Sequence, residues 1–162
     1  MPCRAKQHAA VEVLLPATID AQSSSGCTAL YLAAEAGDQA IVRRLLVAGA
    51  NVALAASDGS PPLMQACRFG HEQCALALIK AGANLEAQII SSGHTALMLS
   101  CQNGYELCAR ALIEAGADTS KAVSGWTALM FAKHYGHTAI CELLEATSIS
   151  SRNTIRKKRY VC

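Results

Sequence analysis

Apolar residues recur along the chain at the spacing of short, paired amphipathic helices. In residues 93–119, a first helix is expected to end at Gly104, because glycine accepts the left-handed conformation at a helix end. A second helix follows, with Cys108, Leu112 and Ile113 on one apolar face. Neither helix can bury its apolar face alone. The pattern therefore predicts antiparallel helix pairs that pack against neighbouring pairs.

The same unit occurs four times in the sequence. Each copy opens on a glycine, and these glycines are separated by 33, 34 and 32 residues. A period in this range is typical of solenoid proteins, in which similar units stack in a row. We predict that the four units cover residues 26–58, 59–92, 93–124 and 125–146.

Two sequence phrases recur in every copy, and in the first they read "GCTALYLAAEAG" and "DQAIVRRLLVAGAN". They resemble the ankyrin repeat, in which G-x-T-P-L-H-x-A-A-x-x-G is followed by V-V-x-x-L-L-x-x-G-A-D/N. The resemblance implies an all-α fold: an ankyrin-repeat solenoid of stacked antiparallel helix pairs with β-turn finger loops. The consensus histidine is replaced by Tyr31, Met64, Met98 and Met130, so the family's threonine–histidine hydrogen bond is expected to be absent.

The two ends of the array depart from the repeat pattern. Residues 1–25 resemble the degenerate second half of a preceding repeat, and we assign them as an N-terminal half repeat or cap. In the fourth copy, Lys133 and Glu145 replace residues that are alanine, cysteine, leucine or isoleucine in the other copies, and Ser148 replaces a glycine. These changes predict a terminal repeat with a polar outer face. Residues 147–162 are predicted to form a disordered, basic tail.

Composition limits how the core is built. Apolar residues make up 52% of the chain but aromatic residues only 4%, so the core must consist of Ala, Leu, Ile, Val and Cys. At equivalent positions, Cys67, Cys74, Cys101 and Cys108 alternate mostly with apolar residues, which is the behaviour of small buried side chains. Reduced thiols of this kind favour a cytoplasmic location, with the nucleus as the alternative.

Basic residues are concentrated at the C-terminus. Residues 152–162 contain five basic and no acidic side chains, whereas residues 1–151 contain nine basic and twelve acidic ones. The run Arg156, Lys157, Lys158 and Arg159 is a candidate localisation signal, or a patch that binds nucleic acid or an anionic membrane surface. The alternative is a solvated tail without a specific role.

The sequence gives little support for catalysis. His71 and Cys74, like His137 and Cys141, share a helix face, but nothing suggests the third group and oxyanion hole that a Cys–His nucleophile needs. A phosphate-binding glycine loop and paired carboxylates are not found either. We therefore predict a protein that is not an enzyme and that has no cofactor, no metal and no small-molecule substrate.

The resemblance implies that proteins bind at the finger tips and on the outward face of the first helices. The candidate binding residues are Arg68, Phe69, His94, Gln102, Asn103, Trp126, His134 and Tyr135. Binding hot spots are enriched in Trp, Tyr and Arg, although these aromatic side chains could instead pack within their own repeats. We expect a monomeric adaptor, scaffold or inhibitor. The alternatives are a fragment of a larger ankyrin-repeat scaffold and a protein that acts through its basic tail.

Overall fold

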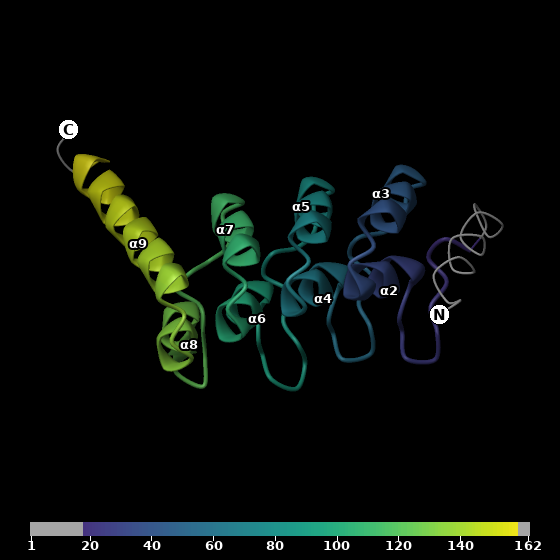
Figure 1. Ribbon diagram of the computed structural model, residues 1–162, viewed down its shortest axis with the longest axis horizontal. Helices are drawn as coiled ribbons and strands as arrows, with labels where there is room; N and C mark the ends of the chain where they lie inside the picture. Colours follow the sequence, from purple (N-terminus) through teal and green to yellow (C-terminus); the bar gives the residue numbers. More distant parts are fainter. Residues whose placement is uncertain (1–17, 159–162) are drawn as a thin grey trace.

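The computed structural model describes residues 18–158, including the side chains of residues 18–148. These residues form helix pairs that lie side by side in one row, from purple at the N-terminal end to yellow at the C-terminal end (Figure 1). The pairs are α2 (Ala29–Ala36) with α3 (Gln39–Val47), α4 (Pro62–Arg68) with α5 (Glu72–Lys80), α6 (Ala96–Asn103) with α7 (Glu106–Glu114), and α8 (Ala128–His134) with α9 (Thr138–Lys158). The predicted all-α solenoid is confirmed.

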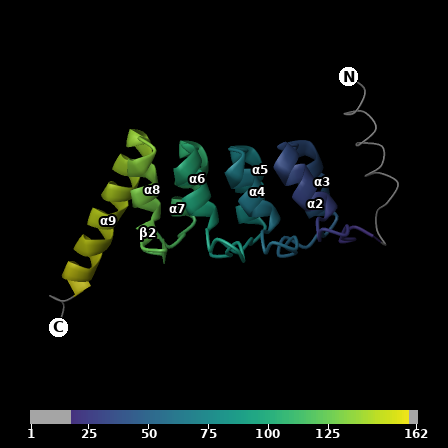
Figure 2. The ribbon, with the colours of Figure 1, turned by 90° about the horizontal axis from the view of Figure 1, so that it is seen from below.

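Loops project from the same side of every helix pair (Figures 1 and 2). We call the tip of each loop a finger. The last finger contains the two strands that the structure assigns in residues 18–158, β1 (Ala122–Val123) and β2 (Trp126–Thr127), which pair in antiparallel fashion. The helices that follow the fingers form one layer, and the second helices of the pairs form the other.

Most first helices begin at a threonine. The hydroxyl groups of Thr28, Thr95 and Thr127 accept hydrogen bonds from the main-chain N–H groups three residues later, which satisfies donors that a helix start leaves free. In the second repeat, α4 instead starts with Pro62, whose missing N–H costs nothing at the first helical position. Each repeat therefore carries its own start signal.

A ring from each following repeat packs over a glycine at the turn between paired helices. Gly104 has φ +78°, and a Cβ atom added there would lie 2.5 Å from the His137 ring. His137 Nε2 also lies 3.2 Å from the carbonyl oxygen of Gln102, which links the fourth repeat to the third. The equivalent pairs are Gly37 with His71 and Gly70 with Tyr105. These contacts set how closely neighbouring repeats approach.

The core runs between the layers through the whole array. Leu30, Leu63 and Leu97 occupy one repeat position in the first helices, and Leu45, Leu78, Leu112 and Leu144 occupy one in the second helices. All seven are at most 3% exposed. Equivalent residues therefore pack against each other from repeat to repeat, as the sequence period predicts.

The four cysteines expected in the core are buried free thiols, which confirms that prediction. Cys67 and Cys108 come from different repeats and share a hydrogen bond; this bond, together with burial, raises the pKa of Cys67 well above its usual value. Burial raises the pKa of Cys101 to about 12. The same hydrogen bond lowers the pKa of Cys108, so its protection depends on burial alone. Because the thiolate is the reactive form, we expect low reactivity of Cys67 and Cys101 in the folded protein.

The outer side of the fourth repeat is polar. Lys133 Nζ lies 2.8 Å from Glu145 Oε1, and both side chains are exposed. The hydrogen bond to Glu145 raises the pKa of Lys133. The two charges that replace apolar residues in this copy therefore pair with each other at the end of the row.

The C-terminal helix is longer than the sequence predicts. The repeat pattern predicts an end at residue 146 and a disordered tail after it, whereas α9 continues to Lys158 and extends beyond the other second helices (Figure 1). The preceding second helix is followed by Gly116, with φ +93°, but Ser148 stands at the equivalent position of α9. Because neither glycine nor proline follows Gly136 in the sequence, nothing forces the helix to end.

The predicted N-terminal half repeat falls mainly on residues 1–17, which are outside the described residues, so it stays a prediction. The segment that follows contacts the first repeat. Ile19 packs against the core, and Asp20 Oδ1 accepts a hydrogen bond of 2.9 Å from the main-chain N–H of Asn51.

Replacing a glycine under a ring should destabilise the protein more than replacing one in open space. Gly104→Ala and Gly116→Ala both place a side chain at positive φ, but only the first meets a ring, since nothing lies within 4 Å of a Cβ at Gly116. We expect Gly116→Ala to lower the free energy of unfolding by about 1 kcal/mol and Gly104→Ala by at least about twice as much. Urea denaturation would measure both, and Gly104→Ala should lose its excess penalty in a His137→Ala background. Equal penalties for the two single variants would show that the ring contact is not a constraint.

The core thiols should be protected from modification in the native state. With an uncharged thiol-specific reagent at pH 8, Cys67, Cys74, Cys101 and Cys108 should react only when the protein unfolds, because burial excludes the reagent and raises the pKa of Cys67, Cys74 and Cys101. The half-buried Cys27 serves as an internal control that reacts sooner. Peptide mapping by mass spectrometry separates the sites. Native labelling of the four core thiols at the rate of Cys27 would contradict the packing.

Candidate partner-binding surface

The fingers differ in length, and the difference is greatest between neighbours in the C-terminal half. In finger 1, the N–H of Ser23 bonds the carbonyl of Cys27, and in finger 2 Ala56 bonds Ser60 in the same way. In finger 3 the equivalent bond joins Ile89 to His94, and in finger 4 the strand partners are Val123 and Trp126. The turns between these residues therefore contain three, three, four and two residues, respectively.

Main-chain hydrogen bonds link the first three fingers to one another. The N–H of Ser57 donates to the carbonyl of Ser25 at 2.9 Å, and the N–H of Ile90 donates to the carbonyl of Asp58 at 2.8 Å. Within residues 18–158, no main-chain bond of this kind joins finger 3 to finger 4. The longest and the shortest turn stand side by side, and their tips do not pair.

An open hollow of about 510 Å³ lies at this mismatch. Its walls come from finger 3, finger 4 and helix α8. The lining residues are Ser91, Ser92, His94, Val123, Ser124, Trp126, Phe131, His134 and Tyr135. Four of the eight binding residues predicted from the sequence therefore meet here: His94, Trp126, His134 and Tyr135.

Ring contacts hold the hollow's walls in place. The Trp126 ring lies 5.4 Å from the Phe131 ring and 5.1 Å from the His134 ring, and His134 packs edge to face against Tyr135 at 4.9 Å. His94 approaches Phe131 from finger 3 at 5.2 Å. Trp126 is still 38% exposed and Tyr135 50% exposed, so both rings combine internal support with a free surface.

The other four predicted residues lie along the ends of the first helices rather than at the hollow. Asn103 Nδ2 donates to the carbonyl of Arg68 at 3.0 Å, which joins repeats two and three. Gln102 Nε2 lies 3.5 Å from the hydroxyl of Tyr135, so this side chain of the third repeat reaches the fourth. Phe69 is 43% exposed and lies under the guanidinium of Arg68. We call the hollow together with these four residues the finger face.

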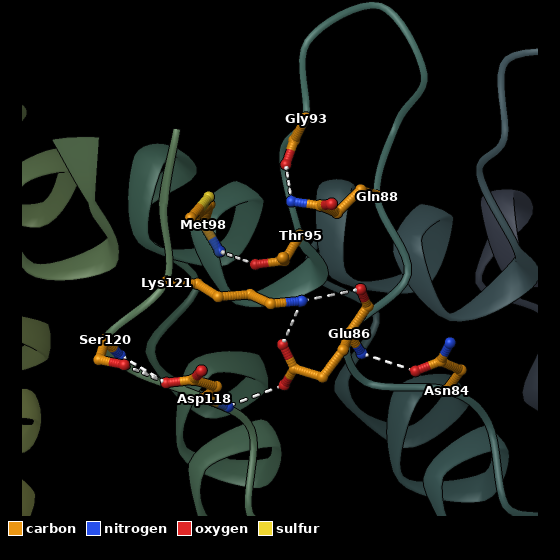
Figure 3. A network of polar contacts seen from close by, with 9 residues as sticks. All are labelled: Asn84, Glu86, Gln88, Gly93, Thr95, Met98, Asp118, Ser120 and Lys121. Carbon is orange, nitrogen blue, oxygen red and sulfur yellow. Dashed lines mark hydrogen bonds and ion pairs between the residues drawn. The ribbon is translucent and has the colours of Figure 1, made fainter. Parts of the chain in front are cut away.

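Polar contacts tie the loops below fingers 3 and 4 together (Figure 3). Glu86 Oε1 accepts a hydrogen bond of 2.8 Å from the N–H of Asp118, and Glu86 Oε2 pairs with Lys121 Nζ at 3.1 Å. The hydrogen bond from the Ser120 hydroxyl lowers the pKa of Asp118, so this carboxylate stays charged. Higher on the third loop, Gln88 Nε2 donates to the carbonyl of Gly93 at 2.9 Å. The bases of the loops are therefore fixed although their tips diverge.

Five lining residues are absent from the binding residues that the sequence predicts: Ser91, Ser92, Val123, Ser124 and Phe131. Of these, Phe131 is the one that supports the other rings. The half-buried ring of Phe131 forms the floor on which Trp126 and His94 pack. The signal that could have found it is the uneven period. The steps of 34 and 32 residues on either side of Gly93 reflect the long third finger and the short fourth one.

The histidines of the two histidine–cysteine pairs lie at repeat interfaces. The Nε2 atoms of His71 and His137 face the carbonyl oxygens of Glu35 and Gln102 at 3.0 and 3.2 Å, so both rings act at repeat interfaces. Within the described part of the chain, no group of three or more His, Cys, Asp or Glu side chains could hold a metal ion. No helix there is both long and apolar enough to span a bilayer.

The basic run is only partly covered by the structure. Arg156, Lys157 and Lys158 are the last residues of α9, and Arg159 lies outside the described residues. The candidate localisation signal stays a prediction.

Comparison with known proteins agrees with the fold. The sequence matches a family described as "Ankyrin repeats (3 copies)" over residues 3–89 and 82–153. Over 72 residues, which are 44% of this chain, it is 40% identical to the E3 ubiquitin-protein ligase KEG of Arabidopsis thaliana. The matched segment spans only 4% of that relative's length. On the breadth of the family match and the four stacked helix pairs, the chain belongs to the ankyrin-repeat family, whose repeats are protein-interaction modules.

Proposed function

We propose that this protein is a non-catalytic adaptor that binds a partner protein through the finger face. The observation that carries the proposal is the hollow between fingers 3 and 4, where Trp126 and Tyr135 are held by other rings and yet exposed. Large aromatic side chains in a supported pocket are the residues that most often dominate binding energy. The polar side chains of Arg68, Gln102 and Asn103 extend the contact area along the array.

The rigidity of the array supports this function. The ring–glycine contacts and the Glu86 network fix neighbouring repeats relative to one another, so little order has to be gained on binding. A preformed surface binds more tightly than a mobile one with the same contacts. The free thiols of the core suit a cytoplasmic or nuclear location, which we include in the proposal.

Two narrower roles are versions of the proposed adaptor. A substrate-recruiting scaffold in a ubiquitin ligase is one version of the adaptor, supported by the identity over 72 residues with a protein of that name. An inhibitor that covers its partner's active site is another, and both would use the finger face. Binding through the basic end of α9 is the competing function, favoured by the extension of this helix to Lys158.

Selection of peptide ligands tests the proposal without requiring that the partner be identified first. A phage-displayed random peptide library is selected on the whole chain, and enriched peptides are then measured by calorimetry. We expect Trp126→Ala and Tyr135→Ala each to weaken binding at least about tenfold, the effect of losing a hot-spot side chain. Leu107→Ala is the matched control, because Leu107 is 55% exposed in α7, in the layer of second helices.

Two outcomes would count against the finger face. Enriched peptides whose affinity is unchanged by both aromatic substitutions would place the binding site elsewhere. Peptides that lose affinity when Lys157 and Lys158 are replaced by alanine, and ignore the aromatic substitutions, would favour the basic end of α9.

Loss of binding should not arise from unfolding. Tyr135→Ala removes the edge-to-face contact with His134 and should lower the free energy of unfolding by no more than about 1 kcal/mol, because the side chain is half exposed. Trp126→Ala removes two ring contacts and should cost about 1 kcal/mol. Leu97→Ala, at a position 2% exposed, should cost about 2–5 kcal/mol and serves as the reference for core damage. Urea denaturation monitored by circular dichroism compares the three, and a core-like penalty for Trp126→Ala would assign that ring to packing.

A further inference from the structure

The hollow between fingers 3 and 4 has a distinctive chemistry. Its walls are aromatic or imidazole rings and its rim carries three serine hydroxyls; its lining contains no Asp, Glu, Lys or Arg side chain. The rings are those of His94, Trp126, Phe131, His134 and Tyr135, and the hydroxyls are those of Ser91, Ser92 and Ser124. An occupant that uses both kinds of group stacks on the rings and forms hydrogen bonds with the hydroxyls at its edge.

The volume leaves room for a partner's side chain together with part of the segment that carries it. About 510 Å³ falls within the range of small-ligand sites, and the hollow is open to solvent, with walls from α8 and the two fingers. One long side chain can therefore enter it and reach both the rings and the hydroxyls.

Electrostatics narrows the choice of side chain. A carboxylate or phosphate would find no Lys or Arg side chain in the lining. The nearby Lys133 is engaged with Glu145 at 2.8 Å on the outer side of the repeat. An aliphatic side chain would form no hydrogen bond with the serine hydroxyls at the rim. Ring faces, in contrast, attract a cation because their quadrupole is negative at the face.

A guanidinium group meets both requirements. It is planar, weakly hydrated and stacks on aromatic rings, and it carries five N–H donors around its edge that serine hydroxyl oxygens can accept. The finger face already contains one such arrangement, since the guanidinium carbon of Arg68 lies 5.9 Å from the centre of the Phe69 ring. An ammonium group lacks the flat face and is more strongly hydrated.

We propose that the hollow between fingers 3 and 4 is an arginine-binding pocket that takes the guanidinium of a partner protein's side chain. The guanidinium stacks against Trp126 and Tyr135 and donates hydrogen bonds to the serine hydroxyls of the two fingers. This inference rests on the proposed function, because it names the anchor residue that the finger face recognises.

The chain provides its own reporter for this pocket, because Trp126 is its only tryptophan. The probes are capped peptides Gly-Ser-Xaa-Ser-Gly, in which Xaa is arginine, lysine, citrulline, leucine or glutamate. Citrulline keeps the shape of arginine and removes the charge. Tryptophan emission of the whole chain is followed as each peptide is added.

We expect the arginine peptide to change the emission saturably, with a dissociation constant on the order of millimolar. Its affinity should exceed that of each of the other four peptides at least about threefold, the effect of a cation on exposed rings. Tyr135→Leu, which removes a ring but keeps an apolar side chain, should weaken the arginine peptide and leave the leucine peptide unchanged. Phe69→Leu, on the same face but outside the hollow, should change neither.

Several results would overturn the pocket assignment. Citrulline, lysine or leucine binding as tightly as arginine would do so, and so would the absence of any change in Trp126 emission. These failures can be told apart from failure of the proposed function. If binding of the library-selected peptides requires Trp126 but their anchor residue is not arginine, the finger face is supported and the arginine pocket is contradicted. If no selected peptide depends on Trp126 or Tyr135, both fall.

Discussion

A ring resting on a glycine determines the geometry of the array. At each internal turn between paired helices, the chain adopts positive φ at a glycine. The ring of the residue just before the next repeat's second helix covers that glycine so closely that a Cβ would not fit. The covering rings of His71 and His137 also bond main-chain carbonyls of the preceding repeat. One contact thus joins backbone conformation to the distance between repeats.

The sequence spacing shows the same constraint. From the opening glycine of each repeat to its turn glycine, the distance is always eleven residues, as from Gly93 to Gly104. From there to the glycine after the second helix it is twelve, as from Gly104 to Gly116. The remaining segment, from that glycine to the next opening glycine, is ten, eleven or nine residues long in successive repeats. All variation in length is therefore placed in the loops that form the fingers, the part of the fold that a partner can reach.

Features that are set within one repeat could be predicted from the sequence, whereas features that depend on two neighbouring repeats could not. The helix pairs, the buried cysteines and the exposure of Trp126 and Tyr135 depend on periodicity within one repeat, and the structure agrees with them. The hollow depends on the relative length of two neighbouring fingers, so residues such as Phe131 gain a role that no single repeat reveals. The repeat pattern predicts a helix end at residue 146, whereas α9 continues to Lys158, because Ser148 stands where a glycine follows the other second helices.

The hollow can exist without weakening the array because its walls and its base are stabilised separately. Glu86 bonds Asp118 and Lys121 at the base of the loops, so the spacing of repeats three and four is fixed there and not at the finger tips. Between neighbouring tips of the first three fingers, main-chain hydrogen bonds hold the loops together. Fingers 3 and 4, both within the described residues, lack such bonds, and side chains line the space between them instead. Trp126 packs against Phe131 and His134 within the fourth repeat. Since units of a solenoid contact only their neighbours, this local exchange of backbone pairing for a ring-lined hollow leaves the other repeats unchanged.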